Sequence, residues 1–148
     1  MILYKVEKVI DAPIERVFSY LSDDEKIKQW NSLFVENIYN SEEDKNACIP
    51  GTKYKSVSKV GKKQLAFDAE LLTYNAPYST TVKGYTKEGE SYSKYVLTET
   101  NEGTLVILEA SLIPKNYYYK IMVKLFGWVS KMMLDEEFDN LKELLEKK

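Results

Sequence analysis

The stretch Ile10–Trp30 reads IDAPIERVFSYLSDDEKIKQW and contains the end of one predicted element and the whole of two others. Pro13 suits the first turn of a helix, because its fixed φ is helical and its missing N–H needs no partner there. Four apolar residues then recur at the i, i+3, i+4, i+7 spacing of an amphipathic helix: Ile14, Val17, Phe18 and Leu21. Ser22 is a suitable N-cap for a second, short helix over 23–30.

Strands are predicted on both sides of this stretch. Residues 2–10 alternate apolar and polar side chains. From about Phe34 to Ile113 the apolar period is again two, and turn residues such as Pro50-Gly51 and Asn101-Glu102-Gly103 separate the runs. Because the separators are short, successive strands should pair as hairpins in an antiparallel meander. The six strands expected there are 34–40, 52–60, 64–74, 79–86, 91–100 and 104–113.

After Pro114 the pattern predicts one long helix to the end of the chain. The order is one strand, two short helices, six strands and a long helix (β-α-α-β6-α), and strands segregated from helices indicate an α+β fold. The long helix needs a surface against which to bury its apolar side. We therefore predict a seven-stranded antiparallel, curved sheet around the C-terminal helix. The sequence contains no repeat or flexible linker, so one domain is expected over residues 1–148.

Short motifs along the chain resemble those of one superfamily. They are Ala12-Pro13 and Val17-Phe18, an Asp at 23 or 24, Trp30, Pro50-Gly51-Thr52, the Gly-Thr pair that opens the last strand, and the helix ending Leu141–Leu145. Together with the order of elements they resemble the START-like (SRPBCC) helix-grip superfamily, in its polyketide cyclase/dehydrase-like branch. The resemblance implies a helix-grip domain with an internal cavity between the sheet and the C-terminal helix. It also implies that Trp30 packs near the cavity entrance.

The first half of the predicted C-terminal helix, YYYKIMVKLFGWVSKMML over 117–134, carries more apolar residues than one buried stripe requires. At about 100° per residue, Lys120, Lys124 and Lys131 form one narrow solvent-facing row. A core-facing seam is predicted on another side: Tyr119, Val123, Phe126, Ser130, Leu134, Leu141 and Leu145. A further apolar group exists only in the first half: Tyr118, Ile121, Met122, Leu125, Trp128, Val129 and Met132.

Four explanations of this extra apolar group stay open. It is consistent with a helix buried more deeply at that end, with the ceiling of a ligand cavity, with a dimer contact, and with an amphipathic helix at a membrane surface.

The cavity hypothesis gives a set of candidate ligand-binding residues. Tyrosines suit a cavity wall, because the ring is apolar and the hydroxyl can orient a ligand. If Tyr95 and Leu97 face inward, the last strand directs Val106 and Leu108 inward and Glu109 outward, and a shift of one residue reverses this. The candidates are Trp30, Tyr54, Phe67, Tyr95, Leu97, Val106, Leu108 and, as the cavity ceiling, Met122, Leu125 and Val129.

Composition excludes several kinds of chemistry. The chain has no histidine, which removes the usual catalytic triads, the common zinc ligand sets and the commonest general base. Its one cysteine, Cys48, cannot form an internal disulfide. The formal net charge of −2 gives no basic footprint for nucleic acid. We expect neither cofactor nor metal, no transmembrane segment and a cytoplasmic location, since the N-terminal residues are too polar for a secretion signal.

Three functions follow from these observations. The leading one is binding of an apolar or amphipathic small molecule, such as a lipid or a polyketide-like compound, by a protein with no assigned catalytic residue. The second is a cyclase or dehydratase in which Tyr95 and Glu109 are the first acid–base pair to inspect. The third is a co-chaperone-like interaction module, and a homodimer is also possible if the extra helix face meets a second copy.

Overall fold

The computed structural model describes residues 1–147 and contains seven strands and four helices in that range. In chain order the elements are β1 (Ile2–Ile10), α1 (Ile14–Ser22), α2 (Asp24–Ile27), β2 (Phe34–Tyr39), α3 (Glu42–Ala47), β3 (Lys53–Val60), β4 (Lys63–Asn75), β5 (Ser79–Thr86), β6 (Gly89–Thr100), β7 (Gly103–Pro114) and α4 (Tyr117–Glu146). The predicted order of elements is confirmed, with α3 as the one addition.

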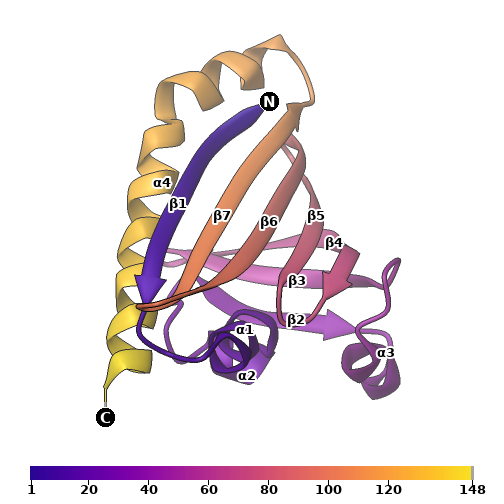
Figure 1. Cartoon of the computed structure of the whole chain (residues 1–148). Coiled ribbons are helices and arrows are strands. Elements are labelled where there is room, and N and C mark those ends of the chain that lie inside the picture. Colours follow the sequence, from indigo (N-terminus) through magenta and orange to yellow (C-terminus); the bar gives the residue numbers. More distant parts are fainter. Residues whose placement is uncertain (148) are drawn as a thin grey trace.

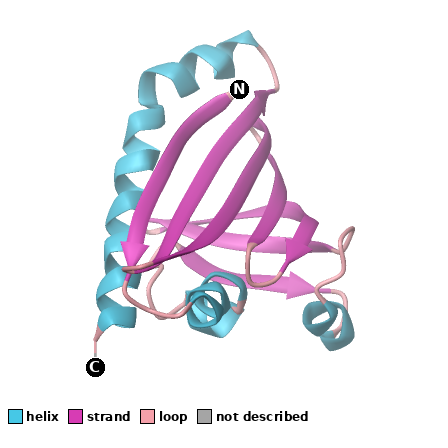
Figure 2. Cartoon of the chain, viewed as in Figure 1, coloured by secondary structure: helices cyan, strands magenta, loops and turns pink. Residues whose placement is uncertain are grey.

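One seven-stranded sheet has the strand order β1-β7-β6-β5-β4-β3-β2, and every neighbouring pair is antiparallel. Strands β2 to β7 form the predicted meander, and β1 joins it beside β7. Figure 1 shows that the sheet curves strongly, with α4 running beside β1 and with α1 and α2 at the end of the sheet where β1 finishes. Figure 2 shows the long helix beside the outermost strand and the shorter helices below the strands, and buried residues of α1 and α4 pack with those of β1, β6 and β7 in one core. This is the α+β helix-grip arrangement that the sequence predicted.

The two helices after β1 differ slightly from the prediction. Helix α1 buries the four residues of its predicted apolar stripe. Ser22, however, belongs to α1, and its hydroxyl donates to the Phe18 carbonyl. The cap of α2 is Asp23, whose carboxylate accepts from the backbone N–H groups of Glu25 and Lys26. Helix α2 ends at Ile27, so Trp30 lies in the turn that follows it.

Helix α3 has no counterpart in the prediction. The Ser41 hydroxyl caps it by accepting from the backbone N–H of Asp44, and three acidic residues occupy its first turn. None of its side chains is fully buried. Because periodicity detects only helices with an apolar stripe, this short polar helix left no signal. The helix ends at Ala47, and its C-cap is Cys48, whose φ of 52° lies in the left-handed region.

The structure decides which face of β6 and β7 is inward, a choice that the sequence left open. Leu97, Val106 and Leu108 are buried in the core with residues of β1, α1 and α4. Glu109 lies on the outer face, where its carboxylate is 3.7 Å from the Lys5 ammonium group. The register question is thereby settled, and Tyr95 and Glu109 lie on opposite faces of the sheet. The proposed acid–base pair of these two residues is therefore wrong.

The two halves of α4 are packed differently. Phe138, Leu141 and Leu145 in the second half are buried in the core. No side chain between Tyr117 and Glu136 is fully buried. The predicted core seam therefore holds in the second half, but it fails in the first half, where Phe126 is 54% exposed. The path of α4 explains this difference. Figure 1 shows that α4 changes direction and that its first turns run across the end of the sheet where β1 begins and β7 ends.

Candidate functional site

The concave face of the sheet contains a partly enclosed pocket of about 120 Å³ between the sheet and helices α1, α2 and α3. We call it the tyrosine pocket. Strand residues Leu71, Val82 and Tyr95 form its inner part, and Leu21 and Ile27 contribute apolar surface from the helices. The remaining lining residues are Ser22, Asp24, Asn37, Tyr39, Asp44, Lys45, Cys48, Thr52, Tyr54, Tyr74 and Thr80.

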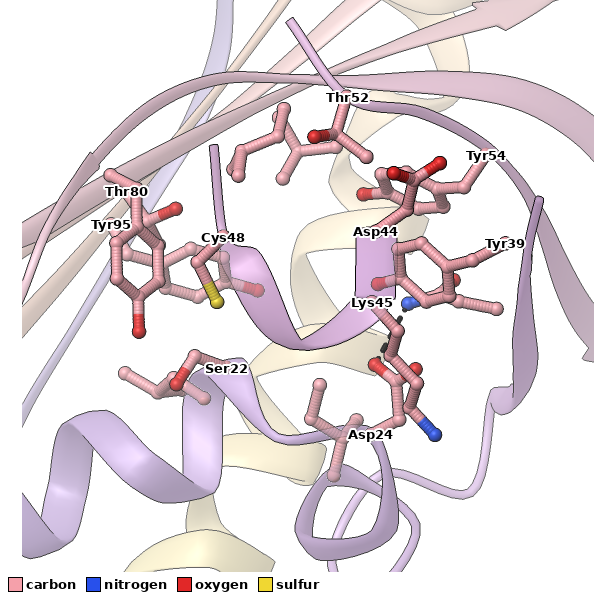
Figure 3. A pocket seen from close by; sticks show the side chains of 16 residues that line it. Ser22, Asp24, Tyr39, Asp44, Lys45, Cys48, Thr52, Tyr54, Thr80 and Tyr95 are labelled. Atoms are coloured by element: carbon pink, nitrogen blue, oxygen red, sulfur yellow. Dashed lines mark hydrogen bonds between the residues drawn. The ribbon is translucent and has the colours of Figure 1, made fainter. Parts of the chain in front are cut away.

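Four tyrosines from four different strands surround this space. Figure 3 shows Tyr95 on one side of the pocket and Tyr39 and Tyr54 on the other, with Ser22 and Asp24 on the helix side. The rings of Tyr39 and Tyr54 stack with centroids 4.9 Å apart, which fixes their orientation. Burial raises the pKa of Tyr39 and that of Tyr95 to about 12, and it also raises the pKa of Tyr54. These hydroxyls therefore stay protonated near neutral pH and can donate hydrogen bonds.

Of the two carboxylates that line the pocket, Asp24 is the buried one, with 7% of the residue exposed. Its Oδ1 accepts from Asn37 Nδ2 at 3.0 Å. Its Oδ2 is buried and has no hydrogen-bond partner within the described chain. Loss of hydration raises the pKa of Asp24, and the hydrogen bond from Asn37 opposes this shift. An unsatisfied buried oxygen of this kind is costly, so it marks a place where a ligand donor fits.

The pocket continues outward into a more open hollow of about 380 Å³. Six residues line both spaces: Ser22, Asp24, Tyr39, Lys45, Cys48 and Tyr74. Asp23, Glu25 and Asn46 belong only to the outer hollow, which is therefore more polar than the pocket. Asp24 thus lies at the boundary between an apolar interior and a polar mouth.

The size of the pocket limits what it can hold in this conformation. A dry protein cavity of about 150 Å³ takes one benzene molecule, and pockets for drug-sized ligands reach about 300–1,000 Å³. At about 120 Å³ the tyrosine pocket accommodates a group near the size of a single ring. A larger ligand would extend into the outer hollow.

A second, open hollow of about 490 Å³ lies between the first half of α4 and the sheet. We call it the α4 groove. Tyr119, Met122 and Phe126 line it from the helix, while Leu3 and Leu112 line it from the strands. It corresponds in place to the cavity expected between sheet and C-terminal helix, but the bend in α4 leaves it open.

The predicted ligand-binding residues are not all in one place. Tyr54 and Tyr95 line the tyrosine pocket, and Met122 lines the α4 groove. Leu125 is 58% exposed and lines neither space, so it is not part of a ceiling over the pocket. Val129 is half-buried and also lines neither. The physical reason is that α4 contributes no residue to the tyrosine pocket, and the side of its first half that faces the sheet lines the α4 groove through Met122 and Phe126.

Four of the remaining candidates belong to the packed interior rather than to either hollow. Leu97, Val106 and Leu108 are core residues. Trp30 packs on Phe138 with ring centroids 5.6 Å apart, and its indole N–H donates to the Tyr20 carbonyl at 2.7 Å.

Phe67 is half-buried on β4 beside Gly84, where an added Cβ would come within 3.0 Å of its ring. The glycine is therefore required for this close packing.

Asp24 and the cover provided by α3 were missed by sequence reasoning. A carboxylate in the first turn of a short helix is usually solvated, since it complements the helix dipole there. The only available signal was the aspartate at 23 or 24 in the family-like motif.

Solved structures show how widely this fold is shared. A protein from Mesorhizobium loti superposes with a TM-score of 0.72 at 18% identity, covering 97% of this chain and 96% of the other. A protein of unknown function from Staphylococcus aureus gives 0.72 at 17% identity, with 97% and 92% covered. A polyketide-cyclase-like protein from Corynebacterium glutamicum gives 0.68 at 13% identity, with 99% and 93% covered. At these identities the likeness establishes the fold alone.

The curved seven-stranded antiparallel sheet with its long C-terminal helix makes this a protein of the helix-grip class. Residues 1–146 match the sequence profile of one family in that class, and the chain belongs to that family, described as polyketide cyclase / dehydrase and lipid transport. The comparison with curated proteins gave no match. Family and fold together support a scaffold that binds hydrophobic ligands.

Proposed function

We propose that this protein binds a small amphipathic molecule in the tyrosine pocket, with an apolar ring inside and a hydrogen-bond donor on Asp24. The observation that carries the proposal is the buried Oδ2 of Asp24, which has no partner within residues 1–147. The strand side of the pocket is formed by Leu71, Val82 and Tyr95, which favour a ring, while the charged Asp44 and Lys45 belong to α3. A polar substituent would extend past Asp24 into the outer hollow.

Binding of p-cresol and of toluene, followed by ligand-observed NMR and calorimetry, tests this. The two molecules share a ring and a methyl group, but only p-cresol has a hydroxyl that can donate to Asp24. We expect p-cresol to bind at least about tenfold more tightly, because a hydrogen bond to a charged group contributes roughly 1.5–3 kcal/mol. In Asp24→Asn the Oδ1 bond to Asn37 is kept but the charged acceptor at Oδ2 is lost, so the preference for p-cresol should fall by several-fold. Equal affinities in the native protein would contradict the role of Asp24.

A variant that fills the pocket gives a second test of where the ligand binds. Val82→Phe adds a ring in the inner part of the pocket and should abolish binding of both compounds. Thr98→Phe places the same side chain at an exposed position of β6 outside the pocket, so it should bind both compounds normally. Undiminished binding by Val82→Phe would move the ligand to another site.

Asp24 also favours a second function, which is acid–base catalysis of the cyclase or dehydratase type. A carboxyl group with a raised pKa in a pocket is a candidate general acid. A single-ring aryl β-hydroxy ketone, first shown to bind by the same NMR assay, would be incubated with the protein, and loss of water from it would be followed by mass spectrometry. Asp24→Asn should still bind such a compound but fail to convert it. Conversion at the native rate by this variant would exclude Asp24 as the acid.

A further inference from the structure

The first half of α4 presents an exposed apolar face that neither hollow uses fully. Six of its large side chains, each between 41% and 74% exposed, form what we call the docking face: Tyr117, Tyr118, Ile121, Leu125, Trp128 and Met132. At about 100° per residue they occupy one arc about 100° wide along the helix. Contiguous exposed apolar surface of this kind marks an interaction site.

Three lysines border this face. Lys120, Lys124 and Lys131 are exposed and fall within about 40° of one another, directly beside the docking face. Within residues 1–147 none of the three forms an ion pair with a carboxylate. Residues 117–134 contain no acidic residue, although the whole chain has a net charge of −2. This segment therefore carries three positive charges and no negative one, and these charges are available to a partner.

The docking face and the three lysines beside it together indicate what kind of partner binds here. Tyrosine and tryptophan side chains prefer the boundary between water and lipid, and lysines beside them reach the phosphate groups. No helix in residues 1–147 is both long enough and apolar enough to cross a bilayer. We propose that the first half of α4 binds the surface of an anionic membrane, with its docking face in the interface and its lysines on the lipid phosphates.

Co-sedimentation with vesicles of phosphatidylcholine containing phosphatidylglycerol tests the proposal. We expect the native protein to bind these vesicles, to bind pure phosphatidylcholine vesicles much more weakly, and to lose affinity at high salt. The triple variant Lys120→Gln/Lys124→Gln/Lys131→Gln should bind roughly 100-fold more weakly, because each lysine near an anionic surface contributes about fivefold. The double variant Leu125→Ser/Trp128→Ser should lose roughly tenfold or more through its smaller apolar area.

The chain offers matched controls for both variants. Lys53, Lys55 and Lys59 are exposed on β3, so their triple change to Gln alters the net charge equally. Ile38 and Leu65 are each 49% exposed outside α4, so their double change to Ser is the apolar control. Both control variants should bind vesicles like the native protein. The proposal is overturned if the native protein does not bind anionic vesicles, or if the α4 variants and the controls weaken binding equally.

Brominated lipids give a site-specific readout. Trp128 is exposed on the docking face whereas Trp30 is buried in the core, so quenching by bromine in the acyl chains should disappear in Trp128→Phe. Light scattering tests the main alternative, in which a second copy of this chain covers the docking face. A dimer that Leu125→Ser/Trp128→Ser converts to a monomer would show that a second copy covers the face, and this would overturn membrane binding. Val82→Phe should bind vesicles normally, which separates this proposal from the one for the tyrosine pocket.

Discussion

At the residue scale, Asp24 combines burial with an oxygen that has no partner, and both features destabilise its ionised form in the free protein. Asp24→Asn removes the charge and keeps the acceptor that Asn37 uses. We expect this substitution to raise the free energy of unfolding by roughly 1 kcal/mol at neutral pH. Urea denaturation of the two proteins measures it directly.

The pH dependence has a definite sign. The pKa of Asp24 is raised in the folded state from its ordinary value of 3.8, mainly by loss of hydration. The ionised carboxylate therefore destabilises the fold above the raised pKa, and this cost falls as acidification proceeds toward 3.8. The advantage of Asp24→Asn should shrink over the same range. A difference that is constant between neutral pH and pH 4 would mean that Asp24 does not titrate with a raised pKa.

Glu137 is a second buried carboxylate, but its oxygens have partners. They accept from the backbone N–H of Ser32 at 3.1 Å, from the Ser32 hydroxyl, and from Asn140 Nδ2 at 3.2 Å. Glu137→Ala should cost roughly 1–3 kcal/mol, because it leaves the Ser32 donors without their acceptor. Its exposed neighbour provides the control, and Glu136→Ala should change the stability by less than about 0.5 kcal/mol in thermal melts. Equal effects would show that the contacts of Glu137 contribute nothing.

These residues show where sequence reasoning was sufficient and where it was not. That Tyr95 and Leu97 share one face of β6 followed from strand alternation, which is a local property. The environment of Asp24 depends on the packing of α2 against β2 and on the cover from α3, and neither is encoded within a few residues of position 24. The two faces of β7 are equally apolar in sequence. Only the pairing with β1 and β6 could therefore show that Glu109 lies on the outer face.

At the element scale, α4 provides a direct comparison between two leucines of one helix. Leu141 is fully buried in the second half, whereas Leu125 is 58% exposed in the first. Leu141→Ala should cost about 2–5 kcal/mol, as for other core leucines. Leu125→Ala should cost less than about 1 kcal/mol. Denaturant melts of both variants measure the difference, and large, equal losses would mean that the first half is ordinary core.

The strands and longer helices were predictable because each has a repeating apolar pattern. Helix α1 kept its four-residue stripe, and the meander kept its order. Helix α3 is too short and polar for such a pattern. The bend in α4 was also hidden, because a helical wheel assumes a straight axis. Gly127 lies in the interior of α4, and a glycine makes bending easier there because it weakens the helix.

At the scale of the whole molecule, the two proposed sites lie at different ends of the fold. The tyrosine pocket lies among α1, α2 and α3, and the docking face lies on the part of α4 that crosses the opposite end of the sheet (Figure 1). The general architecture was predictable from the order of elements and the family resemblance. The separation of the sites was not, because it follows from the path of α4 around the curved sheet.

This separation predicts an uneven distribution of stability along α4. The second half is held by Phe138, Leu141 and Leu145, so its opening requires loss of the core. The first half has no fully buried side chain, so its hydrogen bonds should open at much lower free energy. In hydrogen exchange we expect amides 120–131 to be protected at least roughly 100-fold less than amides 137–145.

Anionic vesicles should change this pattern in one half only. A lipid surface that binds the docking face stabilises the first half by mass action, and it makes no contact with residues 137–145. Protection over 120–131 should therefore rise with vesicle concentration, while protection over 137–145 stays constant. Uniform protection in the free protein would mean that the whole helix folds as one cooperative unit. In that case exposure of the docking face would reflect shape alone, and the first half of α4 would bind as a rigid extension of the core.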